Sequence, residues 1–131
     1  FAVVRFGTDG NLDTSFSGDG KFNTTFGSGA FGGAEFARAV SFGASGRIYV
    51  TGYTSSVAGA TPPGGEDIGI IRLTSAGALD NTFDTDGKKT LDMNSTDDQA
   101  FATLIDGAGD LMIASTIVSG SSDFALTRLQ K

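Results

Sequence analysis

The chain has 131 residues, enough for one domain, and carries a net charge of −6 with a pI near 4.3. This acidic balance disfavours binding to nucleic acid or to an anionic membrane surface, because both attract clusters of lysine and arginine. The chain contains neither cysteine nor histidine, which excludes disulfides, zinc sites with thiolate ligands, cysteine nucleophiles and histidine general bases.

Nine short strands are predicted from the alternation of apolar and polar residues between turns that contain glycine. Pairs such as Asp9-Gly10 and Asp86-Gly87 supply the positive-φ positions that tight turns require. No segment has an apolar period of 3.6 residues over a helical length, so an all-β fold is expected. The strands are expected near residues 1–6, 20–26, 36–42, 47–53, 67–73, 87–93, 100–105, 110–116 and 124–129.

The first of these strands recurs along the chain. Residues 1–6, with the sequence FAVVRF, match residues 68–73 and residues 124–129. Such self-similarity is the signature of a repeat architecture, and the whole of residues 1–131 is therefore one repeat region. The first repeat covers about residues 1–67, the second about 68–123, and residues 124–131 begin a third.

Four strands in a unit of about 55–65 residues match the size of a β-propeller blade. If one four-stranded antiparallel blade runs from the strand at 36–42 to the strand at 87–93, that blade is complete. The two strands before it form the outer half of a preceding blade, and the three strands after it begin the next one. The chain thus holds about two blades, and it begins and ends in the middle of a blade.

Two blades cannot enclose a propeller axis, because propellers close with about four to eight blades. The chain begins at Phe1 and not at methionine, which favours a processed or excised segment of a longer array. A ring or filament of several copies is an alternative, although the strands at 1–6 and 124–129 would compete for one position in a ring. A self-contained fold of two sheets is the third possibility.

The order of the motifs resembles a known bacterial repeat. Residues 9–16, with their Asp-Gly-x-Leu-Asp-x-x-Phe pattern, and residues 124–129 look like the delta-60 repeat. Residues 46–52 are similar to the related bacterial seven-bladed-propeller repeat. The second copy departs from the pattern at residues 75–77, which lack the usual Asp-Gly, and the first hairpin loop is long. The resemblance implies a β-propeller of a secreted or cell-surface protein, without an activity shared by the family.

An arginine recurs at one position of each repeat, on the face of the strand that carries its large apolar side chains. A charge on an apolar face needs a partner. A residue that recurs in every copy is more consistent with a structural role in each repeat than with an active site, which normally occurs once. We therefore expect structural ion pairs. The arginines are Arg5, Arg72 and Arg128, and the candidate partners are Asp13, Asp80, Asp67 and Asp123.

Asp80, Asp84 and Asp86 precede a glycine and are weak candidates for a calcium site, because calcium prefers closely spaced oxygen ligands in a loop that a glycine turns. The spacing lacks the full calcium-loop pattern. Aspartates that accept backbone N–H bonds in turns are the favoured interpretation. No other cofactor is expected.

The remaining polar and aromatic candidates are few. The glutamates, Glu35 and Glu66, lie in loops without an acid–base partner, so no catalytic residue is assigned. Tyr49, Tyr53 and Phe101 could form a platform that stacks on sugar, although core packing is the favoured interpretation. The copy-specific loop from Ser55 to Asp67 is the best candidate for ligand specificity. Its candidate binding residues are Ser55, Thr61 and Glu66.

These observations favour a non-enzymatic, extracellular propeller-type repeat segment that acts in binding, adhesion or assembly. The expected partners are a protein or carbohydrate at the cell surface, neighbouring repeats or further copies of the chain. Neither nucleic acid nor membrane insertion is expected, since no apolar run is long enough to span a bilayer. Two alternatives stay open: a portion of a secreted carbohydrate-active propeller enzyme, and a filament protomer joined by β-strand addition.

Overall fold

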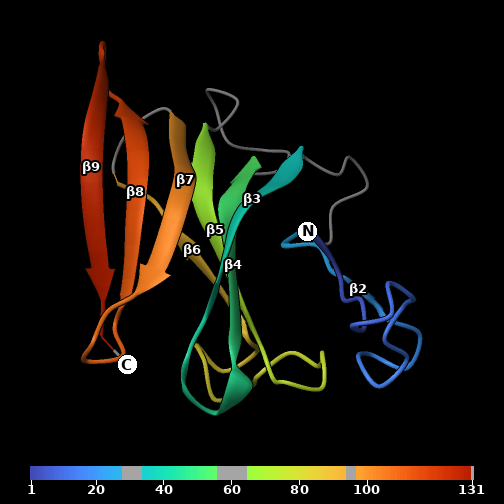
Figure 1. Cartoon of the computed structure of the whole chain (residues 1–131). Coiled ribbons are helices and arrows are strands. Elements are labelled where there is room, and N and C mark those ends of the chain that lie inside the picture. Colours follow the sequence, from blue (N-terminus) through green and yellow to red (C-terminus); the bar gives the residue numbers. More distant parts are fainter. Residues whose placement is uncertain (28–33, 56–64, 94–96, 131) are drawn as a thin grey trace.

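The computed structural model describes residues 1–27, 34–55, 65–93 and 97–130 (Figure 1). These residues form nine strands and a single 3₁₀ turn, η1, and no α-helix. Each strand overlaps one that the sequence predicts, so the all-β prediction is confirmed. The elements are β1 (Ala2–Val4), β2 (Lys21–Asn23), β3 (Glu35–Phe42), η1 (Ala44–Gly46), β4 (Ile48–Ser55), β5 (Glu66–Leu73), β6 (Lys88–Leu91), β7 (Asp97–Ile105), β8 (Leu111–Val118) and β9 (Ser122–Leu129).

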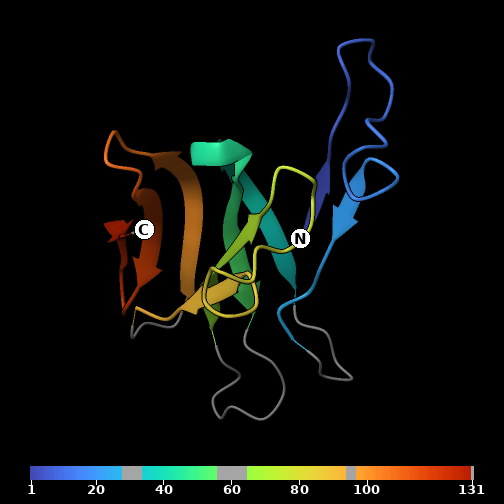
Figure 2. The same cartoon turned by 90° about the horizontal axis from the view of Figure 1, so that it is seen from below.

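The strands pair into three antiparallel sheets that follow one another along the chain. The first sheet is β1-β2, the second is β3-β4-β5-β6 and the third is β7-β8-β9. Figure 2 shows the first and third sheets on opposite sides of the second. The predicted phase is therefore confirmed: a complete four-stranded blade lies between two strands of one blade and three strands of another.

The middle strands of the second sheet, β4 and β5, are buried on both faces. Their side chains point alternately to the two sides of the sheet, and each side packs against a neighbouring sheet. On one face Ile48, Val50 and Ile71 pack with Phe1 and Phe16 of the first repeat. We call this contact the first interface. Phe16 comes from the loop that links β1 and β2, and its side chain is fully buried.

The opposite face of the second sheet packs against the third sheet, and we call this contact the second interface. Ile68 and Ile70 of β5 are fully buried there with Leu111 and Ile113 of β8. The pattern is the same as in the first interface, since Phe1 and Val3 hold the repeat positions of Ile68 and Ile70. Burial of a large aliphatic side chain contributes roughly 1.5–3 kcal/mol, so these rows of side chains hold the sheets together.

The first strands of the second and third sheets carry a β-bulge at the same repeat position. The register of β3 shifts between Ala37 and Ala39, and that of β7 shifts between Ala100 and Ala102. Opposite the first bulge, a Cβ atom on Gly52 would lie only 1.8 Å from the carbonyl oxygen of Phe36, so only glycine fits. A bulge leaves one residue without a cross-strand partner and redirects its side chain.

Within the described residues, no helix is long and apolar enough to cross a membrane.

Candidate functional site

The arginine of the first repeat lies in a partly exposed ion pair. Arg5 Nε lies 2.8 Å from Asp13 Oδ2, and Arg5 also donates to the hydroxyl of Ser15 and to the carbonyl oxygen of Ser75. Hydrogen bonds from the hydroxyl and the N–H of Ser15, and then the charge of Arg5, lower the pKa of Asp13. The structure thus brings Arg5 and Asp13 together and links them to the loop of the second repeat.

The equivalent pair in the second repeat is buried and carries one more cation. Asp80 Oδ2 lies 2.9 Å from Arg72 Nε and 2.8 Å from Arg47 Nε. The hydroxyl of Thr82 donates to Asp80 and also accepts a bond from Arg72. The bond from Thr82, together with those from Arg47 and Arg72, holds the pKa of Asp80 far below its usual range. The guanidinium of Arg72 lies over the ring of Phe83 at 5.0 Å.

The third arginine pairs with residues that the sequence does not single out. Arg128 Nη2 lies 2.6 Å from Asp110 and 3.5 Å from Asp106. Among the described residues, neither Asp67 nor Asp123 lies within ion-pair distance of Arg5, Arg72 or Arg128. The repeat does give a signal for Asp110, because Asp110 occupies the position that Arg47 holds in the preceding copy. At this position one copy carries a cation and the other an anion.

The calcium candidates do not converge on one point. Asp80 is taken up by its two arginines, whereas Asp84 Oδ2 lies 3.3 Å from Lys89 Nζ. Asp86 accepts the backbone N–H of Lys88 at 2.9 Å, as an aspartate in a turn does. Each of these carboxylates therefore has a protein partner of its own.

A different acidic cluster lies where the second and third sheets meet. The carboxylates of Asp67, Asp92 and Asp98 lie within 4.8 Å of one another, and in the part of the chain that is described they form the one such group of three. Burial, and then the charges of Asp92 and Asp98, raise the pKa of Asp67. Asp98 is fully buried and accepts the N–H of Met93 at 2.7 Å. The oxygen ligands of the cluster are of the kind that hard cations prefer.

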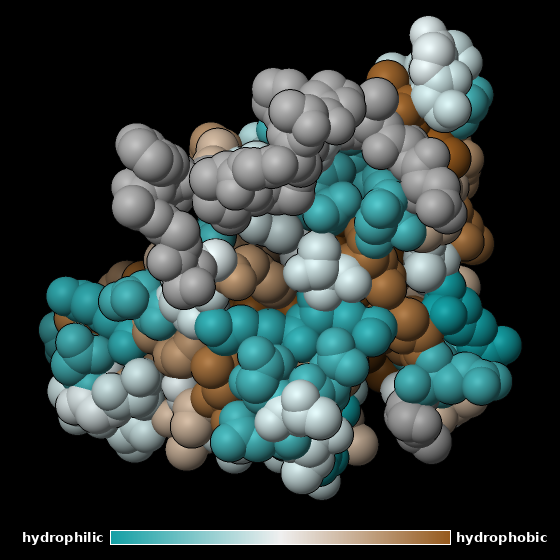
Figure 3. Space-filling view, turned by 180° about the vertical axis from the view of Figure 1, so that it is seen from behind, coloured by the Kyte–Doolittle hydropathy of each residue, from teal (hydrophilic) through white to brown (hydrophobic). Residues whose placement is uncertain are grey.

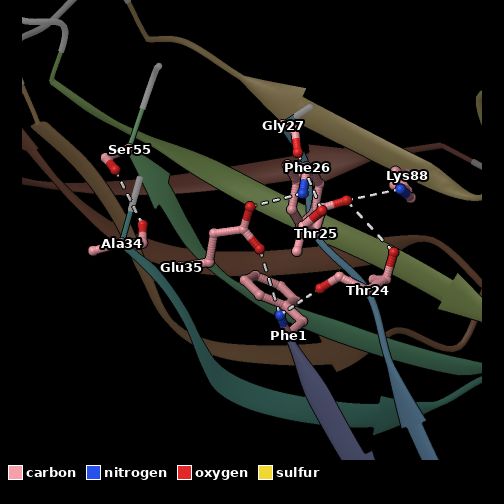
Figure 4. A network of polar contacts seen from close by, with 9 residues as sticks. All are labelled: Phe1, Thr24, Thr25, Phe26, Gly27, Ala34, Glu35, Ser55 and Lys88. Carbon is pink, nitrogen blue, oxygen red and sulfur yellow. Dashed lines mark hydrogen bonds and ion pairs between the residues drawn. The ribbon is translucent and has the colours of Figure 1, made fainter. Parts of the chain in front are cut away.

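The bond from Met93 to Asp98 has a counterpart in the first interface, drawn in Figure 4. Glu35 Oε1 accepts the N–H of Phe26 at 2.7 Å, and its other oxygen lies 3.5 Å from the amino group of Phe1. In both copies, a carboxylate at the start of one sheet receives a backbone N–H that follows the last strand of the sheet before it. The sequence hides this correspondence, because one copy uses glutamate and the other aspartate.

The three aromatic candidates do not form one platform. Tyr49 is buried in the second interface, and Tyr53 is also buried, whereas Phe101 is 47% exposed. Tyr53 stacks on Phe36 with 5.0 Å between ring centroids. The guanidinium of Arg38 lies 5.3 Å from the centroids of both Tyr53 and Phe101. The sequence contains no local signal for this arrangement.

Two of the three binding-loop candidates lie on strand ends. Ser55 closes β4, and its N–H donates to the carbonyl oxygen of Ala34 at 2.9 Å. Glu66 opens β5 and accepts a hydrogen bond from the side chain of Gln99. Thr61 lies outside the described residues.

Comparison with known proteins gives one family. The model of a β-propeller family, described as the domain of unknown function DUF5122, matches residues 1–16 and 43–83. These stretches contain β1, the Arg5–Asp13 pair, the β4–β5 hairpin and the loop of Asp80. No curated protein and no solved structure shows significant similarity to the chain. The sheet order and the family match together identify the chain as a segment of β-propeller-type repeats.

Proposed function

We propose that the chain is a non-enzymatic binding and assembly segment of an extracellular propeller-type protein. One contrast carries this proposal. Phe124 and Leu126 of β9 are 75% and 62% exposed, whereas Ile68 and Ile70, at the same repeat positions of β5, are fully buried by the third sheet. The outer face of β9 thus carries large apolar side chains at positions that are buried in β5, so it is suited to pack against another sheet.

The same face of the third sheet carries a further exposed apolar side chain. Leu104 of β7 is 54% exposed and lies across β8 from β9, and Figure 3 shows hydrophobic surface on the side of the molecule where β9 lies. In the second interface, aliphatic side chains of β8 cover the corresponding residues. The proposed partner therefore presents a sheet with aliphatic side chains, as another propeller-type repeat does.

The opposite end of the molecule is also apolar. A groove of about 370 Å³ runs between β1 and the β3–β4 hairpin. Val4, Val40 and Phe42 line it, and they are 49%, 53% and 70% exposed. Two different apolar ends suit heterologous contacts, in which one end of a unit meets the other end of the next unit.

The finer parts of the proposal rest on sequence features. The Asp-Gly-x-Leu-Asp-x-x-Phe pattern of residues 9–16 supports a delta-60 type of repeat, and that resemblance supports the proposed extracellular location. The non-enzymatic role is supported by the recurring arginines, each of which pairs with an aspartate. Ion pairs that recur in every copy stabilise the repeat, and they are not the single set of residues that an active site needs.

Sedimentation of the purified chain over a range of concentrations tests the proposal. We expect the parent chain to associate as its concentration rises, and the double variant Phe124→Ser/Leu126→Ser to remain monomeric because its apolar face is lost. The variant should keep the thermal stability of the parent, since both side chains are exposed in the monomer. Met93→Ser, which removes an apolar side chain 38% exposed elsewhere, is the matched control. Equal association of parent and double variant, or none in either, contradicts the proposal.

A further inference from the structure

Arg38 differs from the other four arginines of the chain. Those four each lie within 4.0 Å of an aspartate oxygen: Arg5 with Asp13, Arg47 and Arg72 with Asp80, and Arg128 with Asp110 and Asp106. Within the described residues Arg38 has no carboxylate at ion-pair distance, and the residues outside that description contain no aspartate or glutamate. Its charge is therefore open to an external anion.

The backbone places Arg38 at the bulge of β3. The register of β3 with β4 passes from Ala37 to Ala39, so Arg38 has no cross-strand partner. The equivalent residue of β7 is Phe101, which is skipped in the same way between Ala100 and Ala102. Because a bulge redirects the side chain of the extra residue, both copies turn that side chain toward their common boundary, where Arg38 lies over the ring of Phe101.

Two aromatic rings contact the guanidinium. It lies 5.3 Å from the ring centroids of both Tyr53 and Phe101, and Phe36 stacks on Tyr53. Tyr53 is buried, but Phe36 and Phe101 remain 49% and 47% exposed. An arginine held on aromatic faces keeps its N–H groups directed outward in a fixed fork, and that fork matches the two oxygens of a carboxylate.

We propose that Phe36, Arg38 and Phe101 form a binding site for a uronate residue of an acidic oligosaccharide. The guanidinium receives the carboxylate in a bidentate pair, and the exposed rings pack against the apolar C–H face of the pyranose. The chain as a whole carries a net charge of −6, which opposes an anionic ligand, so the affinity must come from the guanidinium and the exposed rings.

The bulge favours a sugar over a peptide as the ligand. An extended peptide would bind by adding a strand to the free edge of β3, which requires a regular row of N–H and C=O groups. A bulge interrupts that row in the middle of the strand. A sugar acid needs only the side chains.

None of the three residues of this site lies on β9, although Arg38 also lines the groove at the other apolar end. The β9 variant Phe124→Ser/Leu126→Ser therefore leaves the site intact. Loss of self-association in Phe124→Ser/Leu126→Ser and loss of uronate binding in an Arg38 variant are therefore separate outcomes. Either proposal can fail while the other stands.

Titration of ¹⁵N-labelled protein with trigalacturonate, followed by NMR, tests the site. We expect shifts at the amides of Phe36, Arg38, Tyr53 and Phe101, and binding that weakens as salt is added. Arg38→Gln should weaken binding roughly tenfold, because a charge-assisted pair is lost, and Phe101→Ala should weaken it roughly fivefold. Arg38→Lys should restore only part of the affinity, because lysine lacks the planar fork.

Arg128→Gln is the matched control, since it removes the same charge from an exposed arginine that already has aspartate partners. It should leave the affinity within roughly twofold of the parent. Galactotriose, the neutral counterpart of the probe, should bind far more weakly. Equal binding of galactotriose, unchanged binding in Arg38→Gln, or tighter binding of a glutamate-rich peptide at these amides would overturn the proposal.

Discussion

The two interfaces of the second sheet use the same repeat positions but bury them to different extents. In the first repeat, the side chains of Arg5 and Asp13 are 31% and 29% exposed. In the second, those of Arg72 and Asp80 are 11% and 7% exposed, and Arg47 adds a second cation. The same short pattern thus yields a solvent-screened pair in one copy and a buried network in the other, because the neighbouring sheet decides how much water remains.

Removal of Asp80 should be among the most damaging single changes to this chain. Asp80→Asn leaves two arginine charges without a carboxylate, and we expect a loss on the order of 3 kcal/mol in the free energy of unfolding. Asp13→Asn removes the exposed counterpart and should cost much less, since water screens that pair. Urea unfolding of both variants measures the difference, and equal losses would show that burial does not separate the two pairs.

The low pKa of Asp80 sets the pH range of this effect. Its folded pKa lies below its unfolded value, so the stabilisation is present at neutral pH and is lost as pH falls through the folded pKa. The gap between the parent and Asp80→Asn should therefore persist when the pH is lowered into the ordinary range of aspartate. A gap that closes above pH 4 or so would contradict the strong pairing.

The two copies also differ at one turn glycine. Gly10 and Gly77 hold the same repeat position with φ of +79° and +86°, but a Cβ atom at Gly10 would meet nothing within 4 Å. At Gly77 it would lie 2.7 Å from the ring of buried Phe16. We expect Gly10→Ala to cost about 1 kcal/mol from the left-handed backbone alone, and Gly77→Ala to cost a further 1–3 kcal/mol, approximately, from overpacking.

Thermal unfolding of Gly10→Ala and Gly77→Ala separates these contributions, because the backbone strain is common to both variants. The difference between them reports the packing of the second repeat on Phe16. Equal effects would mean that the loop moves away from the first repeat without cost.

Most of the fold is predictable from the sequence because its signals are local. Alternation along each strand and glycine in most of the connections identify all nine strands, and the repeat then indicates which strands share a sheet. The ends of β1, β2 and β6 are less predictable, and all three strands are shorter than expected. A strand ends where its pairing ends, and β6 pairs with β5 over only four residues.

The sites are harder to predict because they depend on contacts between sheets. Arg5 with Asp13 and Arg72 with Asp80 lie close in sequence, and the repeat brings out the common spacing. Arg38 meets Phe101 across the boundary between two sheets, at bulges that leave no mark in the alternation pattern. Neither partner indicates the other until the register of both strands is known.

The acidic cluster at the second interface gives the smallest expected effect and the opposite sign. Asp67 has a raised pKa, so its folded form holds a proton more tightly than its unfolded form, and ionisation of Asp67 opposes folding. Asp67→Asn should therefore unfold at a slightly higher temperature than the parent at pH 7, and the gain should shrink as the pH falls into the usual range of aspartate. Melting curves at several pH values measure this change in melting temperature.

In the first interface Glu35 faces the amino group of Phe1 instead of two further carboxylates, so Glu35→Gln should show no such gain. A lower melting temperature for Asp67→Asn at pH 7 would show that the ionised carboxylate of Asp67 stabilises the fold, as it would in a cluster that binds a cation.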